Sequence, residues 1–91
     1  MRKFTTYCTD QKTGHQIIYS ECSYNMACFE LENELSKIGI DIVDARPIPN
    51  GLMQISTMEN GKRGRNFYYD EERGYLLADD KLKGWRLDNA V

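Results

Sequence analysis

The side chains best suited to chemistry lie in one stretch, residues 62–69, in which basic and aromatic residues follow one another. Residues two apart on a β-strand point to the same face, so a strand here would present cations beside rings. Cations bind phosphate groups and rings stack on bases, which is the combination that single-stranded nucleic-acid-binding modules use. The residues of this predicted basic and aromatic platform are Lys62, Arg63, Arg65, Phe67 and Tyr69.

Two features of the same stretch argue against nucleic-acid binding. Phe67 and Tyr69 also have the apolar character of core residues, which would leave the basic residues as the solvated tip of a hairpin. Three acidic residues, 70–72, follow directly and would repel a phosphate backbone. Nucleic acid is therefore the alternative partner that the sequence indicates, and another protein is the principal one.

Four residues, Cys8, His15, Cys22 and Cys28, belong to the types that bind zinc or act in nucleophilic catalysis. Their spacing is not that of a zinc knuckle, and on the predicted N-terminal strands His15 has the opposite parity from Cys8 and Cys22. The sequence contains no P-loop, no dinucleotide-binding glycine pattern and no GxSxG motif. We therefore predict a protein without a metal site, a cofactor or enzymatic activity.

Composition is that of an ordinary soluble protein. The chain has 91 residues, of which 41% are hydrophobic and 29% charged, and this length predicts a single domain over residues 1–91. A net charge of −2 creates no overall field toward nucleic acid or an anionic membrane. Without a long apolar run, a signal peptide or a lipidation motif, and with an odd number of cysteines, we expect a cytoplasmic protein with reduced thiols and no membrane partner.

A helix is predicted over residues 23–39, the one stretch with a clear helical period. Its apolar residues recur at helical spacing and form one stripe: Tyr24, Ala27, Cys28, Leu31, Leu35 and Ile38. Ser23 is a suitable N-cap, and Gly39 stands where a left-handed residue commonly ends a helix.

Strands are predicted on both sides of this helix. Residues 4–9 and 16–22 form a hairpin around a loop that ends in Gly14, in a register that pairs Cys8 with Ile18. Beyond the helix, strands are expected at 40–46, 52–58, 63–69 and 75–78, with Asn-Gly turns at 50–51 and 60–61. The fold class is α+β: an N-terminal β-hairpin, one central amphipathic helix and a mainly antiparallel β-meander (ββαββββ). A strand–helix–strand step across the helix could add one parallel pair.

The predicted sheet has two apolar faces and only one helix to cover them. If both Asn-Gly turns are two-residue loops, Phe67 and Tyr69 share a face with Met58, and Ile40 and Ile55 lie on the other. Neither face is consistently polar, although a one-sided antiparallel sheet normally alternates. The second face must be covered by the C-terminal tail around Leu82, Trp85 and Leu87, by a partner, or by a second copy of the chain.

The outward side of the helix carries a possible contact patch. Met26 and Phe29 project away from the core stripe, with Asn33 beside them and Glu30 on the flank. Large apolar residues facing water can be isolated surface residues, or they can form the centre of a protein interface. The partner-binding residues that we predict are Met26, Phe29, Glu30 and Asn33.

These observations favour a small non-enzymatic protein that binds another protein. Compact, mildly acidic binders of this kind are typical of phage or mobile-element inhibitors, so the expected partner is a host enzyme or defence complex whose working surface is occluded. A homodimer formed through the second sheet face is a further possibility. The alternative is a single-stranded nucleic-acid-binding or regulatory module that uses the platform at residues 62–69.

Overall fold

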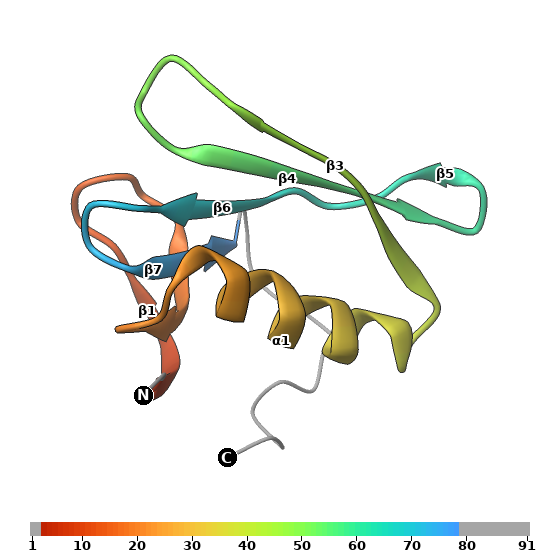
Figure 1. Cartoon of the computed structure of the whole chain (residues 1–91), viewed down its shortest axis with the longest axis horizontal. Coiled ribbons are helices and arrows are strands. Elements are labelled where there is room, and N and C mark those ends of the chain that lie inside the picture. The colour runs from red at the N-terminus through yellow and green to blue at the C-terminus, as the bar shows by residue number, and fades with distance from the viewer. Residues whose placement is uncertain (1–2, 79–91) are drawn as a thin grey trace.

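The computed structural model describes residues 3–78 of the chain, with side chains from residue 9 onward. One helix, α1 (Tyr24–Ser36), follows two strands and precedes five others (Figure 1). The strands are β1 (Lys3–Thr9), β2 (Gln16–Ser20), β3 (Ile40–Pro47), β4 (Met53–Glu59), β5 (Lys62–Arg63), β6 (Phe67–Asp70) and β7 (Tyr75–Ala78). The predicted α+β class, with a hairpin before the helix and an antiparallel meander after it, is confirmed.

The strands form one sheet in the order β1-β2-β7-β6-β4-β3, and the short β5 pairs with the end of β4. Each pairing within residues 3–78 is antiparallel. β2 and β3 are separated by three strands, so the connection through α1 crosses the sheet and forms no parallel pair among the described residues. β7 instead lies between β2 and β6 and joins the N-terminal hairpin to the meander.

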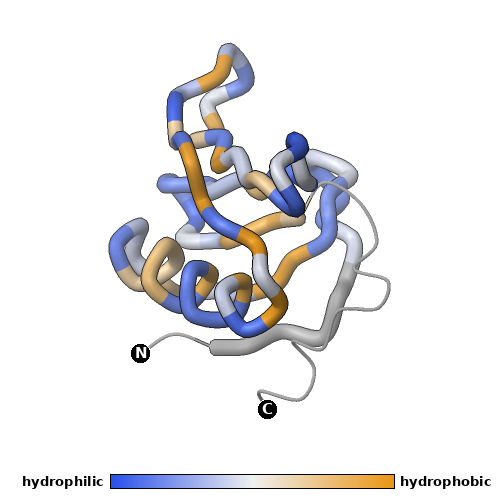
Figure 2. Tube along the Cα trace, turned by 90° about the vertical axis from the view of Figure 1, so that its right-hand side faces the viewer, coloured by the Kyte–Doolittle hydropathy of each residue, from blue (hydrophilic) through white to orange (hydrophobic). Residues whose placement is uncertain are grey.

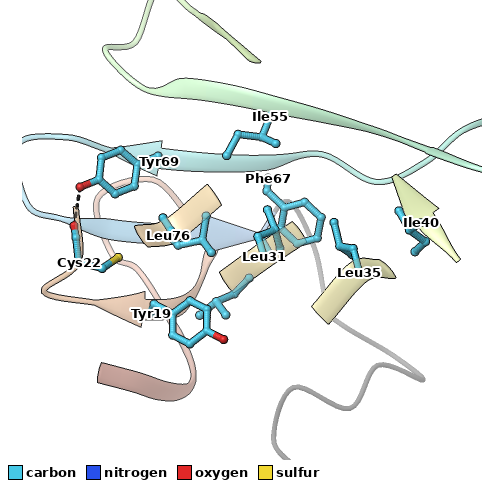
Figure 3. Close-up of a cluster of buried hydrophobic side chains, with 12 residues drawn as sticks. Tyr19, Cys22, Leu31, Leu35, Ile40, Ile55, Phe67, Tyr69 and Leu76 are labelled. Carbon is cyan, nitrogen blue, oxygen red and sulfur yellow. Dashed lines mark hydrogen bonds between the residues drawn. The ribbon is translucent and has the colours of Figure 1, made fainter. Parts of the chain in front are cut away.

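α1 covers one face of this sheet and closes a continuous apolar core. Ala27, Leu31 and Leu35 are fully buried on the helix, which confirms the centre of the predicted stripe. They meet apolar side chains from several strands, which Figure 3 shows converging beneath the helix: Tyr19, Ile40, Ile55, Phe67, Tyr69 and Leu76.

The helix begins as predicted and ends earlier than predicted. Ser23 is the N-cap, and its hydroxyl oxygen accepts a hydrogen bond from the Met26 amide at 3.2 Å. At the other end, the Ile38 and Gly39 amides bond to carbonyls only three residues back, which tightens the chain after Ser36. This turn moves Ile38 out of the stripe, so its predicted place in the core is wrong and its side chain is exposed.

The N-terminal hairpin differs from its predicted register. Cys8 pairs with Ile17 rather than with Ile18, and the loop extends over residues 10–15. The reason is that Asp10 leaves the strand: its amide donates to the His15 carbonyl at 2.7 Å, and its carbonyl accepts from the Gly14 amide at 2.8 Å. Gly14 has φ of 79°, so the predicted glycine turn is present inside a longer loop.

The two Asn-Gly turns behave differently. Asn60 and Gly61 both have positive φ, and Glu59 opposes Lys62, as expected for a two-residue hairpin loop. At the other turn the Ile48 amide donates to the Leu52 carbonyl at 3.0 Å, which encloses three residues. The prediction of a two-residue loop at 50–51 is therefore wrong, because Pro49 begins a wider turn there.

The predicted strand at 63–69 is interrupted, and this changes which residues share a face. Met58 pairs with Arg63, but Ile55 pairs with Phe67, so one extra residue separates β5 from β6. A shift of one residue moves the following side chains to the opposite face. Phe67 and Tyr69 therefore lie with Ile55 on the helix-covered face, and their predicted grouping with Met58 is wrong.

The second face of the sheet carries a smaller apolar cluster. Leu52, Tyr68 and Leu77 are buried there, with Ile17, Ile48 and Tyr75 half-buried around them. Loop 10–15 lies against this cluster, because the His15 ring stacks on Tyr68 with ring centroids 4.5 Å apart. The tail that we expected to cover this face, with Leu82, Trp85 and Leu87, lies outside the described residues.

Candidate functional site

The predicted partner-binding residues all lie on α1, three of them exposed on the side away from the core and Glu30 on the flank. Phe29 is 57% exposed and Met26 is 40% exposed, although both are large apolar side chains. Asn33 is exposed beside them, and Glu30 is half-buried on the flank of the helix. We call these four residues the outer helix patch. The structure brings them together because their spacing places them opposite the buried stripe.

The surroundings of the outer helix patch are acidic. α1 contains Glu30, Glu32 and Glu34 and no lysine or arginine. Lys37, the C-cap residue, lies 3.3 Å from the Glu34 carboxylate and neutralises only that end of the helix. The patch is thus apolar at its centre and negatively charged at its margin, a composition that suits an interface with an apolar and basic partner.

The predicted nucleic-acid platform is not assembled in the predicted way. Lys62 and Arg63 are exposed at the tip of the β4–β5 hairpin, and Arg65 is half-buried after it. Phe67 is fully buried and Tyr69 nearly so, hence neither ring offers a free surface on which a base could stack. The expectation of one shared strand face is wrong, because the interruption at residues 64–66 separates the cations from the rings.

A buried ionic network, which the sequence reasoning missed, links the two loops at one end of the sheet. The Arg73 guanidinium donates to both carboxylate oxygens of Asp10, at 2.9 and 2.7 Å. The Nε of Arg73 donates to the Asp70 carboxylate at 2.7 Å. The guanidinium carbon Cζ lies over the Tyr75 ring, 4.6 Å from its centre. Asp10 and Asp70 are both buried, so Arg73 is the cation that compensates two carboxylates removed from water.

The ionisation of these groups reflects their pairing. The hydrogen bonds from Arg73 hold the pKa of Asp10 well below its usual range, against the opposing effect of burial. At Asp70 burial favours the neutral form, but hydrogen bonds from Arg73 outweigh it and lower the pKa. The same contacts raise the pKa of Arg73, led by its bond to Asp10.

A sequence signal for this network does exist. Residues 10–14 and 70–74 both have the pattern Asp-x-x-x-Gly. In each, the glycine amide donates to the aspartate carbonyl at 2.8 Å and the glycine has positive φ. The repeated pattern predicts two equivalent turns, each presenting an aspartate side chain that can bond to its own turn. The pattern does not show that the turns meet across the sheet.

Two hollows lie at the end of the sheet where these turns meet the β3–β4 loop. A cleft of about 680 Å³ is bordered by loop 10–15, residues 50–52 and residues 70–72. A smaller cavity of about 190 Å³ adjoins it and is lined by Tyr24, Tyr69 and Glu71 together with apolar residues of the β3–β4 loop. Gly51, Leu52 and Glu71 border both hollows.

Comparison with known protein families, with curated proteins and with solved structures finds no match. The functional assignment therefore depends on the geometry of the chain itself.

Other candidate chemistry is limited in the part of the chain that the structure describes. Cys22 and Cys28 form no disulfide, and no three side chains of His, Cys, Asp or Glu gather there as metal ligands. The Cys22 thiol lies 3.4 Å from the Gly74 carbonyl, a structural contact. Within residues 3–78 no helix has the length and apolar character needed to cross a membrane.

Proposed function

We propose that this protein works by binding another protein through the outer helix patch, without a catalytic step of its own. The observation that carries the proposal is the 57% exposure of Phe29, next to Met26, on a helix whose opposite side is fully buried. Burying aromatic and methionine side chains is a main source of free energy in protein interfaces. The folded domain gains nothing from leaving these two side chains in water.

In this proposal the protein acts by occlusion, as an inhibitor that covers a working surface of its target, for example a host enzyme or a defence complex. A short helix that presents Phe29 and Met26 from a rigid sheet resembles the helix-in-groove mode of recognition, in which apolar anchors enter a groove of the partner. The acidic margin of the patch adds attraction to a basic target and faster association.

Two other interpretations have less support. The nucleic-acid module keeps exposed cations at Lys62 and Arg63 but has no available rings at Phe67 and Tyr69. A homodimer through the second sheet face has little apolar surface to bury among the described residues, because Leu52, Tyr68 and Leu77 are already buried there and the His15 ring stacks on Tyr68. Pairing along β3 is disfavoured by the register shift between Ile42 and Asp44 and by Pro47 at the end of the strand. Figure 2 shows the alternation of apolar and polar residues along this strand, which rises from the end of the helix.

The test immobilises three versions of the protein, exposes each to lysate of the source cells or their host, and compares the proteins that each version retains. They are the wild type, the double variant Met26→Ala/Phe29→Ala, and Ile38→Ala, which truncates another exposed apolar residue outside the patch. We expect the wild type and Ile38→Ala to retain the same protein, and the double variant to lose it with an unchanged free energy of unfolding. Retention by the double variant would refute the assignment of binding to this patch.

A further inference from the structure

The cavity of about 190 Å³ lies between three segments that are distant in the sequence. These are the first turn of α1, the β3–β4 loop and the turn between β6 and β7, which all lie at the same end of the sheet in Figure 1. Its walls are apolar over most of their area, with Ile48, Leu52 and Met53 on the side of the loop. This surface is concave and lies away from the exposed side of α1.

Two tyrosine rings line the opposite side of the cavity. Tyr24 and Tyr69 form an edge-to-face pair, with ring centroids 5.5 Å apart and planes inclined by 63°. The Tyr69 hydroxyl donates to the Cys22 carbonyl, which fixes this ring (Figure 3). A hydrogen bond with Cys28, together with burial, raises the pKa of Tyr24 to about 12, and burial also raises the pKa of Tyr69. Tyr24 is half-buried and supplies the accessible ring of the pair, whereas Tyr69 is nearly fully buried and supports it from the wall of the cavity.

Glu71 supplies a negative charge at the same cavity. Of the three consecutive acidic residues, Asp70 is bonded to Arg73, and Glu72 lies 3.5 Å from Lys12. Glu71 is exposed and lines the cavity, and Lys12 borders the adjoining cleft with it. It is close enough to Tyr69 for its charge to contribute to the raised pKa of that ring. A carboxylate at the rim and two rings in the wall together favour a cation that carries apolar carbon.

We infer that this cavity binds an alkylammonium group, supplied by a lysine side chain in an extended segment of a partner protein. The four-carbon stem packs against Ile48, Leu52 and Met53, while the ammonium head lies near the rings of Tyr24 and Tyr69 and the carboxylate of Glu71. A protein segment is favoured over a small free ammonium compound because the cavity continues into the 680 Å³ cleft. That cleft can hold the backbone on either side of the lysine, and its border includes the ion pair between Lys12 and Glu72.

The test is a titration of the labelled protein, followed by NMR, with three probes. They are a blocked tripeptide Gly-Lys-Gly, the same tripeptide with norleucine in place of lysine, and choline. We expect the lysine tripeptide to cause saturable changes in the NMR chemical shifts of Tyr24, Met53 and Tyr69. Choline should cause weak changes, and the norleucine tripeptide should cause none. Equal binding of the norleucine tripeptide would overturn the cation site. Choline binding as tightly as the lysine tripeptide would overturn the assignment to a protein segment.

Matched variants locate the site. Glu71→Gln removes the exposed carboxylate without touching the core, and we expect it to weaken the lysine tripeptide about two- to fivefold. Glu72→Gln removes the adjacent charge, which lies beside Lys12, and should leave that affinity unchanged. Equal effects of the two variants would overturn the role of Glu71. Phe29→Ala should not alter tripeptide binding, so failure of the outer helix patch and failure of this cavity are separate results.

Discussion

The two faces of the sheet are closed by different interactions. On the helix side, Leu31, Leu35 and Phe67 are fully buried and belong to one apolar cluster that spans the helix and several strands. On the second face, a smaller cluster around Tyr68 is covered in part by loop 10–15, whose aspartate is bound by Arg73. One face is closed by apolar packing, and the other combines a small apolar cluster with a charge network.

This difference has consequences for how each face responds to its conditions. Apolar burial is non-directional and largely insensitive to pH and moderate salt. A buried carboxylate pair is directional, since it requires a cation in one geometry and an ionised partner. We therefore expect the helix side to set the overall stability and the second face to set its dependence on pH.

The largest effect should come from a truncation on the helix side. Phe67→Ala removes a fully buried ring at the centre of the core and should lower the free energy of unfolding by about 3–5 kcal/mol. Urea denaturation followed by circular dichroism measures this loss. Phe29→Ala is the matched control, since that ring is exposed and its removal should cost less than about 0.5 kcal/mol. Equal losses would contradict the placement of the core.

The next effect should come from the second face. Arg73→Met leaves the buried carboxylates of Asp10 and Asp70 without their cation and should lower the free energy of unfolding by about 2–4 kcal/mol. This loss is smaller than for a fully buried ion pair because Arg73 itself is half-buried. Arg46→Met provides the control: its pair with Asp44 is as short but exposed, so its removal should cost under about 1 kcal/mol. A comparison of urea midpoints tests both, and similar losses would show that the network does not hold the loop.

As the pH falls, the ionic network on the second face should lose its stabilising effect before the apolar core on the helix side does. The pKa values of Asp10 and Asp70 are lowered in the folded protein relative to the ordinary value of 3.8, so the unfolded chain takes up protons first as the pH falls. The stabilisation is complete above about pH 5 and is lost progressively as the pH falls through 3.8 and then through the lowered pKa values of the folded protein. We expect the free energy of unfolding to fall over this range in the wild type and to fall less steeply in Asp10→Asn. The same slope in both proteins would contradict the assignment.

The smallest of these effects should come from the ring that anchors the loop. His15→Ala removes the stacking on Tyr68 but leaves the bonds between Asp10 and Arg73, so it should cost about 1 kcal/mol. Amide exchange followed by NMR should show faster exchange in loop 10–15 and unchanged protection in α1. Faster exchange in the helix would instead show that the two faces are coupled.

Much of the fold follows from local sequence patterns. The spacing of Ala27, Leu31 and Leu35, the cap at Ser23 and the turn at Asn60-Gly61 are short-range signals, and each gives a correct local structure. Element order depends on such signals alone, so the α+β class is predictable.

Turn chemistry alone did not predict which residues of β6 face the helix. One extra residue between β5 and β6 moves the following side chains to the opposite face of the sheet. Gly64 is the signal that marks the place, since a glycine inside a strand often indicates a bulge. Its amide donates to the Thr57 carbonyl, and a Cβ at this position would lie 2.6 Å from the Thr57 hydroxyl oxygen. The close approach requires glycine at residue 64.

The candidate site was predictable in part. The exposure of Met26 and Phe29 follows from helical period, whereas the charge network joins Asp10 and Arg73, 63 residues apart. The cavity likewise combines Tyr24 with Tyr69 and Glu71. No local pattern specifies such long-range contacts, which depend on the strand order of the sheet.

The position of β7 has a consequence for synthesis on the ribosome. β1, β2 and α1 are made first, but the strand that joins β2 to the rest of the sheet is the last described one, ending at Ala78. Until that strand leaves the exit tunnel, the apolar side of the helix has only part of its sheet to cover. The domain therefore closes late, in a single step that depends on contacts distant in sequence. A released chain that ends before residue 75 should be bound by chaperones or degraded, whereas a chain that includes β7 should form the protected domain.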